Sequence, residues 1–400
     1  MLKKGNETNK LLFTTGMAWL FDAMDVGMLS FIIAALKSEW NLNETQMGWI
    51  GSVSSIGMAI GAILFGILAD YFGRKDILII TLLLFSIATG FSAFTTSYAL
   101  FLILRFFVGA GLGGELPVAS TLVSESVPVK SRGKIVVLLE SFWAGGWIIA
   151  AVISYFVIPS WGWRVALLIS ALPVFYALYL RYGLKENSIA QNKRIAKQSS
   201  LKENLLNLWS SQYYKTTIML WTVWFMVVFS YYGMFLWLPS VVILKGYGLM
   251  HSFGYTLIMT LAQLPGYFAA AWLIEKWGRK WVLTIFLTGT AISALGFGSA
   301  STLFSLLFFG ILLSFFNLGA WGALYAYSPE QYPTTMRASG TGIAAGIGRL
   351  GGILGPLMVG KMITKQYSFT FIFIIFCVAI MLAVLVIIIL GKETKNTKLE

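Results

Sequence analysis

A series of apolar stretches, each long enough to cross a lipid bilayer as a helix, dominates this 400-residue sequence. The hydrocarbon core of a bilayer is about 30 Å thick, and a helix of about 20 residues spans it. Only 11% of the residues are charged, whereas soluble proteins carry about 25%. The apolar pattern predicts twelve spans, at residues 11–36, 47–69, 77–95, 98–124, 134–158, 163–182, 216–243, 252–274, 281–299, 303–327, 337–363 and 368–390.

The positions of the basic residues predict how the chain is oriented. Of the 29 Lys and Arg, 22 fall in the termini and in one alternating set of loops, and five fall in the opposite loops. Because cytoplasmic loops are enriched in Lys and Arg, we expect a multi-pass protein of the cell membrane with both termini in the cytoplasm. The formal net charge of +13 then reflects topology in the lipid bilayer, and no nucleic acid is expected as a partner.

One long polar segment divides the twelve spans into two sets of six. It covers residues 183–215 and is rich in Lys and Arg, which predicts a cytoplasmic linker. The chain is therefore expected to consist of an N-terminal six-helix half, residues 1–182, and a C-terminal six-helix half, residues 216–400.

Short motifs recur in the two halves at a constant distance of 205 residues. Residues 70–75 read Asp-Tyr-Phe-Gly-Arg-Lys, and residues 275–280 read Glu-Lys-Trp-Gly-Arg-Lys. A Glu, a Pro and an Arg at 125, 128 and 132 recur at 330, 333 and 337. Parallel repeats of this kind occur in secondary transporters, whose site lies between the halves. The candidate gating residues, predicted to hold helix ends together when the cytoplasmic side is closed, are Asp70, Arg74, Glu125, Arg132, Glu275, Arg279, Glu330 and Arg337.

These motifs resemble those of a known transporter family. Residues 66–75, Gly-Ile-Leu-Ala-Asp-Tyr-Phe-Gly-Arg-Lys, resemble the loop between the second and third helices of the major facilitator superfamily. Residues 105–133, which contain Gly109, Gly111, Gly113 and Pro117, resemble the fourth helix and following loop of its sugar-porter and organic-ion branches. The resemblance covers the whole chain. It implies an all-α integral membrane fold of twelve transmembrane helices in two six-helix pseudo-repeats.

Two carboxylates, Asp22 and Asp25, lie one helical turn apart inside the first span. Residues at i and i+3 share a helix face, and a charge at mid-span normally faces the bundle interior. Two anions at this spacing repel by about 3 kcal/mol at an effective dielectric of about 20, which favours a proton on one of them and predicts proton coupling. The alternative is a static pair with a buried Arg, for which Arg105 is the natural partner. The Asp-x-x-Asp spacing resembles that of aromatic-acid/proton symporters in this superfamily, which often have Gly at the position of Ala23.

Arg349 lies near the middle of the eleventh span, with no acid within two turns on its own helix. A buried guanidinium binds a carboxylate through two parallel hydrogen bonds. The partner is then either a substrate carboxylate or a residue of another helix, such as Glu115 or Asp25. The segment resembles organic-anion transporters of the superfamily, which implies an anionic substrate.

Aromatic residues and lone amides in other spans suggest a site for a flat ligand. Aromatic walls with a few amide groups suit a heteroaromatic molecule, although aromatics also fill cores and amides also bond across helices. The candidate substrate-binding residues are Arg349, Trp143, Trp147, Tyr231, Tyr232, Gln263 and Asn317. The candidate proton-coupling residues are Asp22, Asp25, Arg105, Glu115 and Glu140.

Other chemistries find little support in the sequence. The glycines at 109, 111, 113 and 114 follow no strand, so they predict close helix packing and not a dinucleotide site. His251 is the only histidine, so no metal site is expected. We expect no cofactor other than the proton gradient and no enzymatic activity.

The function expected from the sequence is proton-coupled import of a small aromatic or organic acid. Residues 19–27, 114–120, 230–239 and 324–333 resemble the bacterial niacin transporters of the superfamily, which implies nicotinate or nicotinamide as the substrate. A drug/proton antiporter is less favoured because the fifth span has no Gly-Pro motif. A sugar or other metabolite porter is less favoured because Gln263 is nearly the only amide in the fifth, seventh and eighth spans.

Overall fold

The computed structural model describes residues 2–72, 74–126, 132–176, 179, 206–333 and 336–395. Within these ranges the side chains of residues 2–12, 14, 67, 69–71, 74, 75, 78, 115–126, 132–136 and 338 lie outside the description. The described chain is helical and contains no strand.

The described part of the first half contains five long helices. They are α1 (Leu2–Glu39), α2 (Glu44–Phe72), α3 (Arg74–Ser92), α4 (Tyr98–Ser126) and α5 (Arg132–Ser170). Helix α5 covers both the fifth and the sixth predicted span. At Gly162 its backbone leaves the helical region, with φ 81° and ψ 165°, and the chain turns back there. Glycine allows this conformation because it has no Cβ.

The second half contains eight helices because two of its spans are broken. They are α9 (Tyr214–Phe235), α10 (Leu238–Leu244), α11 (Leu249–Leu261), α12 (Gln263–Trp277), α13 (Arg279–Ser299), α14 (Leu303–Glu330), α15 (Arg337–Thr364) and α16 (Phe369–Leu390). Helix α10 begins one residue before Pro239, and α12 begins two residues before Pro265. Proline lacks the backbone N–H and disrupts the preceding turn, so the seventh and eighth spans are each discontinuous.

The helices confirm the predicted number of spans. Nine helical segments of the described chain are long and apolar enough to cross a membrane. One of these, Val137–Tyr176, turns back at Gly162 and supplies two spans, and the shorter apolar helices Ile79–Ser92 and Tyr98–Gly114 supply two more. The total is the twelve spans that the sequence predicts.

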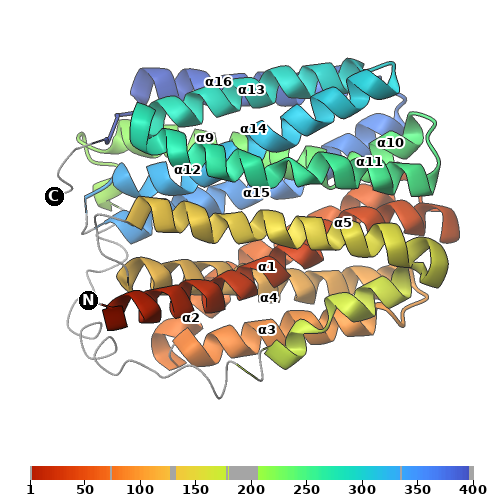
Figure 1. Ribbon diagram of the computed structural model, residues 1–400, viewed down its shortest axis with the longest axis horizontal. Coiled ribbons are helices and arrows are strands. Elements are labelled where there is room, and N and C mark those ends of the chain that lie inside the picture. Colours follow the sequence, from red (N-terminus) through yellow and green to blue (C-terminus); the bar gives the residue numbers. More distant parts are fainter. Residues whose placement is uncertain are drawn as a thin grey trace.

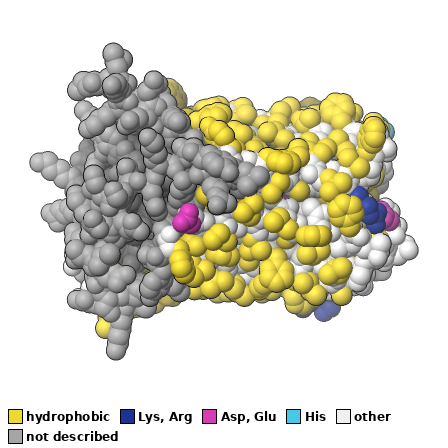
Figure 2. All heavy atoms as spheres, turned by 90° about the horizontal axis from the view of Figure 1, so that it is seen from below, with side chains coloured by type: hydrophobic (Ala, Val, Ile, Leu, Met, Phe, Trp, Pro, Cys, Tyr) yellow, Lys and Arg dark blue, Asp and Glu magenta, His cyan; other side chains and the backbone are white. Residues whose placement is uncertain are grey.

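The two sets of helices lie side by side with their long axes roughly parallel, and both ends of the chain lie at one end of the bundle (Figure 1). Figure 2 shows hydrophobic side chains over most of the described surface, with charged side chains near its ends. Large apolar side chains point outward along the helices, among them Ile63, Phe91, Phe156 and Ile292. A surface of this kind is stable against lipid tails and not against water.

At the end of the bundle away from the two chain termini, called the far end here, the two halves are in close contact along α2 and α15 (Figure 1). A Cβ added to Gly48 would lie 2.7 Å from the carbonyl oxygen of Pro356, so only glycine fits there. The hydroxyl groups of Thr45 and Thr364 lie 3.0 Å apart at the same end. Small residues allow two helix backbones to approach closely inside a membrane.

The same two helices pack less closely near the chain termini. A Cβ added to Gly66, Gly342 or Gly346 would meet no atom of the described residues within 4 Å. The seam between the halves, defined here as the contact of α2 with α15, is therefore close at the far end and leaves open space at these glycines.

The close seam at the far end predicts a cross-link that stops the transport expected from the sequence. In a Cys377→Ser background, the double variant Thr45→Cys/Thr364→Cys should form a disulfide on oxidation, because the two positions are close enough for one. Loss of maleimide-reactive thiols would report the bond. Uptake of the expected organic acid should fall to background on oxidation and return on reduction, while each single-cysteine variant stays active; unchanged uptake in the cross-linked protein would show that the seam at the far end does not open during transport.

Candidate functional site

A buried ion pair joins four spans of the first half. Arg105 and Asp25 are 0% and 2% exposed, and Arg105 Nη1 lies 3.3 Å from Asp25 Oδ2. The hydroxyl groups of Thr89 and Ser170 donate hydrogen bonds of 2.9 and 3.3 Å to Asp25 Oδ1. Arg105 Nη2 donates to the hydroxyls of Thr89 and Ser92 at 3.4 and 3.3 Å. Helices α1, α3, α4 and α5 each contribute to this network.

The structure assigns different surroundings to the two acids of the first span. Asp25 is bound by a cation and two hydroxyl donors of the first half. Asp22, one turn earlier and 1% exposed, interacts electrostatically with the hydroxyl of Tyr232 in α9. Asp25 is therefore held in the network of the first half, and Asp22 interacts with a residue of the second half. The predicted pairing of Arg105 with one of the two Asp residues is observed for Asp25.

Arg349 lies at the boundary between the halves. Its Nη1 is 3.3 Å from Tyr232 Oη and 3.3 Å from Met58 Sδ. Among the residues that the structure describes, no carboxylate forms a salt bridge with it. Asp25, one of the two predicted cross-helix partners, is bound to Arg105 instead, so this alternative is wrong. The side chain of the other, Glu115, lies outside the described residues.

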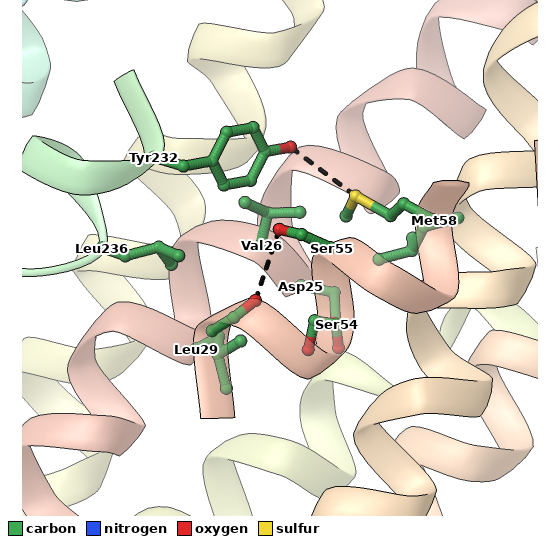
Figure 3. A pocket seen from close by; sticks show the side chains of 10 residues that line it. Asp25, Val26, Leu29, Ser54, Ser55, Met58, Tyr232 and Leu236 are labelled. Atoms are coloured by element: carbon green, nitrogen blue, oxygen red, sulfur yellow. Dashed lines mark hydrogen bonds between the residues drawn. The ribbon is translucent and has the colours of Figure 1, made fainter. Parts of the chain in front are cut away.

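A small cavity lies beside this boundary. Asp25, Ser54, Ser55, Met58 and Tyr232 are among its lining residues (Figure 3). Tyr232 and Met58 point toward each other across it, and Tyr232 Oη is 3.6 Å from Met58 Sδ. The cavity therefore lies between the buried ion pair of the first half and the two residues that Arg349 contacts.

Five aromatic residues from four helices surround the centre of the molecule. We call this group the aromatic cage: Trp19 of α1, Trp143 of α5, Tyr231 of α9, and Trp321 and Tyr325 of α14. The Trp143 indole N–H donates to Tyr231 Oη at 2.8 Å. The rings of Tyr231 and Trp321 have centroids 4.8 Å apart, and Trp19 contacts the edges of Trp143 and Tyr325.

The sequence predicted part of this cage. Trp143 and Tyr231 were candidates, and the structure brings them together. Trp147 also contacts Tyr231, with ring centroids 6.4 Å apart. Trp19, Trp321 and Tyr325 were missed. Trp321 and Tyr325 are four residues apart and share one helix face. Trp143 and Trp147, the candidates in the fifth span, have the same spacing, so the same pattern could have identified Trp321 and Tyr325.

Several polar side chains are buried around the cage without a hydrogen-bond partner among the described residues. They include one oxygen of Glu140, the indole N–H of Trp147, and both polar atoms of Gln263 and of Asn317. Gln263 is the first residue of α12, directly after the break in the eighth span. Buried polar groups are usually paired, so unpaired ones at a helix break indicate a place where a ligand or water binds.

The structure describes the central residues of one predicted gating cluster, which are Glu275, Arg279 and Glu330. Arg279 bridges Glu275 at 3.3 Å and Glu330 at 3.2 Å, which ties together the adjoining ends of α12, α13 and α14. Glu393, which the sequence did not single out, accepts the backbone N–H groups of Arg279 and Lys280. These helices all belong to the second half, so the cluster stabilises the end of that half.

The remaining gating candidates are placed only in part. Arg337 donates to the backbone carbonyl of Tyr332 at 3.4 Å. The side chains of Asp70, Arg74, Glu125 and Arg132 lie outside the described residues.

Membrane-spanning helices in two halves, repeated cytoplasmic motifs and buried charges at their boundary are the features of a secondary transporter. The family model of the Major Facilitator Superfamily matches residues 15–262 and 248–400. The chain belongs to this superfamily and is a multi-span membrane transporter, as the sequence resemblance implied.

Two curated relatives match nearly the whole chain. A Bacillus subtilis (strain 168) protein, provisionally named niacin/nicotinamide transporter NiaP, is 64% identical over 391 residues, with 98% of both chains covered. The niacin transporter NiaP of Acinetobacter baylyi is 45% identical over 417 residues, with 98% of this chain and 95% of that protein covered. The solved structure of the proton:xylose symporter XylE bound to 6-bromo-6-deoxy-D-glucose matches with a TM-score of 0.78 at 20% identity, over 99% of this chain and 98% of that one, which shows the shared fold.

The buried ion pair predicts an asymmetry between single and double substitutions. Asp25→Leu should destabilise the folded protein by about 3–5 kcal/mol, because Arg105 is left buried without its anion. The double variant Asp25→Leu/Arg105→Leu should recover most of this loss, which thermal unfolding of the purified protein measures. If the double variant were as unstable as Asp25→Leu, the unpaired charge of Arg105 would not be the cause of the lost stability.

Proposed function

We propose that this protein imports nicotinate, or a close aromatic acid, across the cell membrane together with protons. The observation that carries the proposal is the identity of 64% and 45%, over nearly full length, to two relatives named for niacin transport. The aromatic cage and Arg349 are consistent with it, since nicotinate is a flat ring that carries one carboxylate.

In this proposal Arg349 binds the substrate carboxylate. Its guanidinium lies between the halves, touches Tyr232 and Met58, and has no ion-pair partner among the described carboxylates. An anion there would gain charge-assisted hydrogen bonds with fixed geometry. The ring would then stack in the neighbouring cage, where aromatic contacts favour a flat ligand. Trp147 contacts Tyr231 of the cage, and Gln263 and Asn317 are proposed to offer further polar groups, since both are buried with no hydrogen-bond partner among the described residues.

Asp22 is the proposed proton carrier. Asp25 is occupied by Arg105 and two hydroxyl donors, whereas Asp22 faces the Tyr232 side, where Arg349 is also bound. A proton on Asp22 would remove a negative charge near the incoming carboxylate, so the two would be bound together. Their joint binding would neutralise the boundary and allow the halves to rock about the site, with both termini on the cytoplasmic side.

Uptake into proteoliposomes tests the proposal. Radiolabelled nicotinate should accumulate when the outside is more acidic than the lumen, and only equilibrate without the gradient. Unlabelled nicotinate should compete and glucose should not. Nicotinamide, which lacks the carboxylate, should compete less well because it cannot form the ion pair with Arg349. Absence of nicotinate uptake under all conditions would refute the proposed substrate.

Replacement of Arg349 separates substrate binding from folding. Arg349→Leu should raise the KM for nicotinate by at least about tenfold, since charged hydrogen bonds contribute about 1.5–3 kcal/mol. Arg349→Lys should recover only part of the affinity because it cannot bind both carboxylate oxygens. Arg164→Leu, which removes a partly exposed Arg of α5 that pairs with Glu39 away from the proposed site, serves as the matched control and should transport normally.

The Asp22→Asn variant tests the proton step. Exchange of labelled for unlabelled nicotinate across the membrane should persist, while accumulation driven by a pH gradient should be lost. Gradient-driven accumulation at the normal level in Asp22→Asn would exclude Asp22 as the proton carrier.

A further inference from the structure

Glu140 supplies a carboxyl group to the edge of the aromatic cage. Its side chain is 1% exposed, and its Oε2 has no hydrogen-bond partner among the described residues. The indoles of Trp19 and Trp321 lie next to it. No Lys or Arg of the described chain forms a salt bridge with it.

Such a group requires a partner. A buried hydrogen-bonding group left unpaired costs about 1–3 kcal/mol, and an isolated buried charge costs more. Asp25 is a fully paired carboxylate, surrounded by an Arg and two hydroxyls. Glu140 has only the indole N–H groups of Trp19 and Trp321 as nearby donors, and its Oε2 has no partner among the described residues. This leaves one carboxyl oxygen for a polar group of a molecule that enters the cage.

The position of Glu140 relative to Arg349 indicates which part of that molecule it meets. Arg349 contacts Tyr232, whose ring contacts that of Tyr231, a member of the cage. Glu140 lies one turn before Trp143 in α5, and the Trp143 indole donates to the same Tyr231. The two groups therefore both lie next to the cage, with opposite hydrogen-bonding chemistry. A ligand held by its carboxylate at Arg349, with its ring in the cage, directs its remaining ring atoms toward Glu140.

We propose that Glu140 determines specificity by recognising the ring nitrogen of a pyridine carboxylate. This inference rests on the proposed function and names the substrate class of that site. One proton lies between the Glu140 carboxyl group and the ring nitrogen. A neutral Glu140 donates it to the pyridine, and an ionised Glu140 accepts it from the pyridinium N–H, so the same hydrogen bond forms in either case.

This arrangement selects against rings without the nitrogen. Benzoate has the same shape and carboxylate but would leave Glu140 unpaired in the cage. A site built around a polar contact rejects an analogue that lacks it much more strongly than an apolar pocket rejects a change of shape. Nicotinamide keeps the nitrogen, so Glu140 would not distinguish it from nicotinate, and that choice would depend on Arg349.

Calorimetric titration of the purified full-length protein with three probes tests the inference. The wild type should bind nicotinate at least about tenfold more tightly than benzoate, and at least about tenfold more tightly than 1-methylnicotinate, whose ring nitrogen is blocked. In Glu140→Leu the affinity for nicotinate should fall at least about tenfold, while that for benzoate should stay the same or rise. Glu140→Gln should keep most of the preference for nicotinate, because its amide N–H can donate to the nitrogen.

The outcomes separate this inference from the proposed function. Wild-type protein that binds nicotinate, benzoate and 1-methylnicotinate equally would overturn the role of Glu140 while leaving the transport of aromatic acids in place. A folded Glu140→Leu variant with an unchanged ratio of nicotinate to benzoate affinity would also overturn it. Wild-type protein that binds none of the three would instead refute the proposed function. The wild-type titrations decide the matter even if the Leu variant does not fold.

Discussion

The ion pair between Asp25 and Arg105 is the interaction on which the first half depends. Neither group can reach water, and a charge in the middle of a membrane is costly unless an opposite charge and hydrogen-bond donors surround it. The pair satisfies this requirement with residues from α1, α3, α4 and α5 at once. Helices that share a polar network of this kind are expected to move together, so the first half can act as one body.

The second half is held differently. Its spans are broken near Pro239 and Pro265, and one of its ends is tied by Arg279 to Glu275 and Glu330. The second break leaves Gln263 buried at the start of α12, with no hydrogen-bond partner among the described residues. Irregular backbone at membrane depth is stable only where it lies within protein or lines a cavity. The first half, joined by its polar network, and the interrupted second half meet at the boundary beside Arg349.

The contact of α2 with α15 is closer at one end of the bundle than at the other. The backbones approach closely at Gly48 at the far end, while Gly342 and Gly346 of α15 meet no neighbour among the described residues. Arg349 of α15 contacts Met58 of α2 and Tyr232 of α9 at this boundary. A carboxylate bound there would touch residues of both halves, which is the condition for coupling binding to a change in their relative position.

Much of the fold followed from the sequence because the bilayer restricts the possible structures so strongly. Apolar length alone predicted the twelve spans, and the constant spacing of 205 residues between the cytoplasmic motifs predicted the duplication. The helix breaks were not predicted, although Pro239 and Pro265 were visible, since a proline inside a span can also produce only a kink. Three of the five residues of the aromatic cage were not predicted, because tryptophan and tyrosine are common in membrane helices for other reasons.

The sequence by itself determined the class of the protein, its topology and the set of residues too polar to face lipid. Those properties depend on local composition and spacing, which hold whatever the neighbouring helices do. Only the tertiary structure decided how the polar residues pair. It assigned Arg105 to Asp25, left Arg349 at the boundary beside Tyr232, and enclosed Glu140 among aromatic rings. These contacts join residues from different helices, and their distances depend on how the helices pack and not on any spacing along the chain.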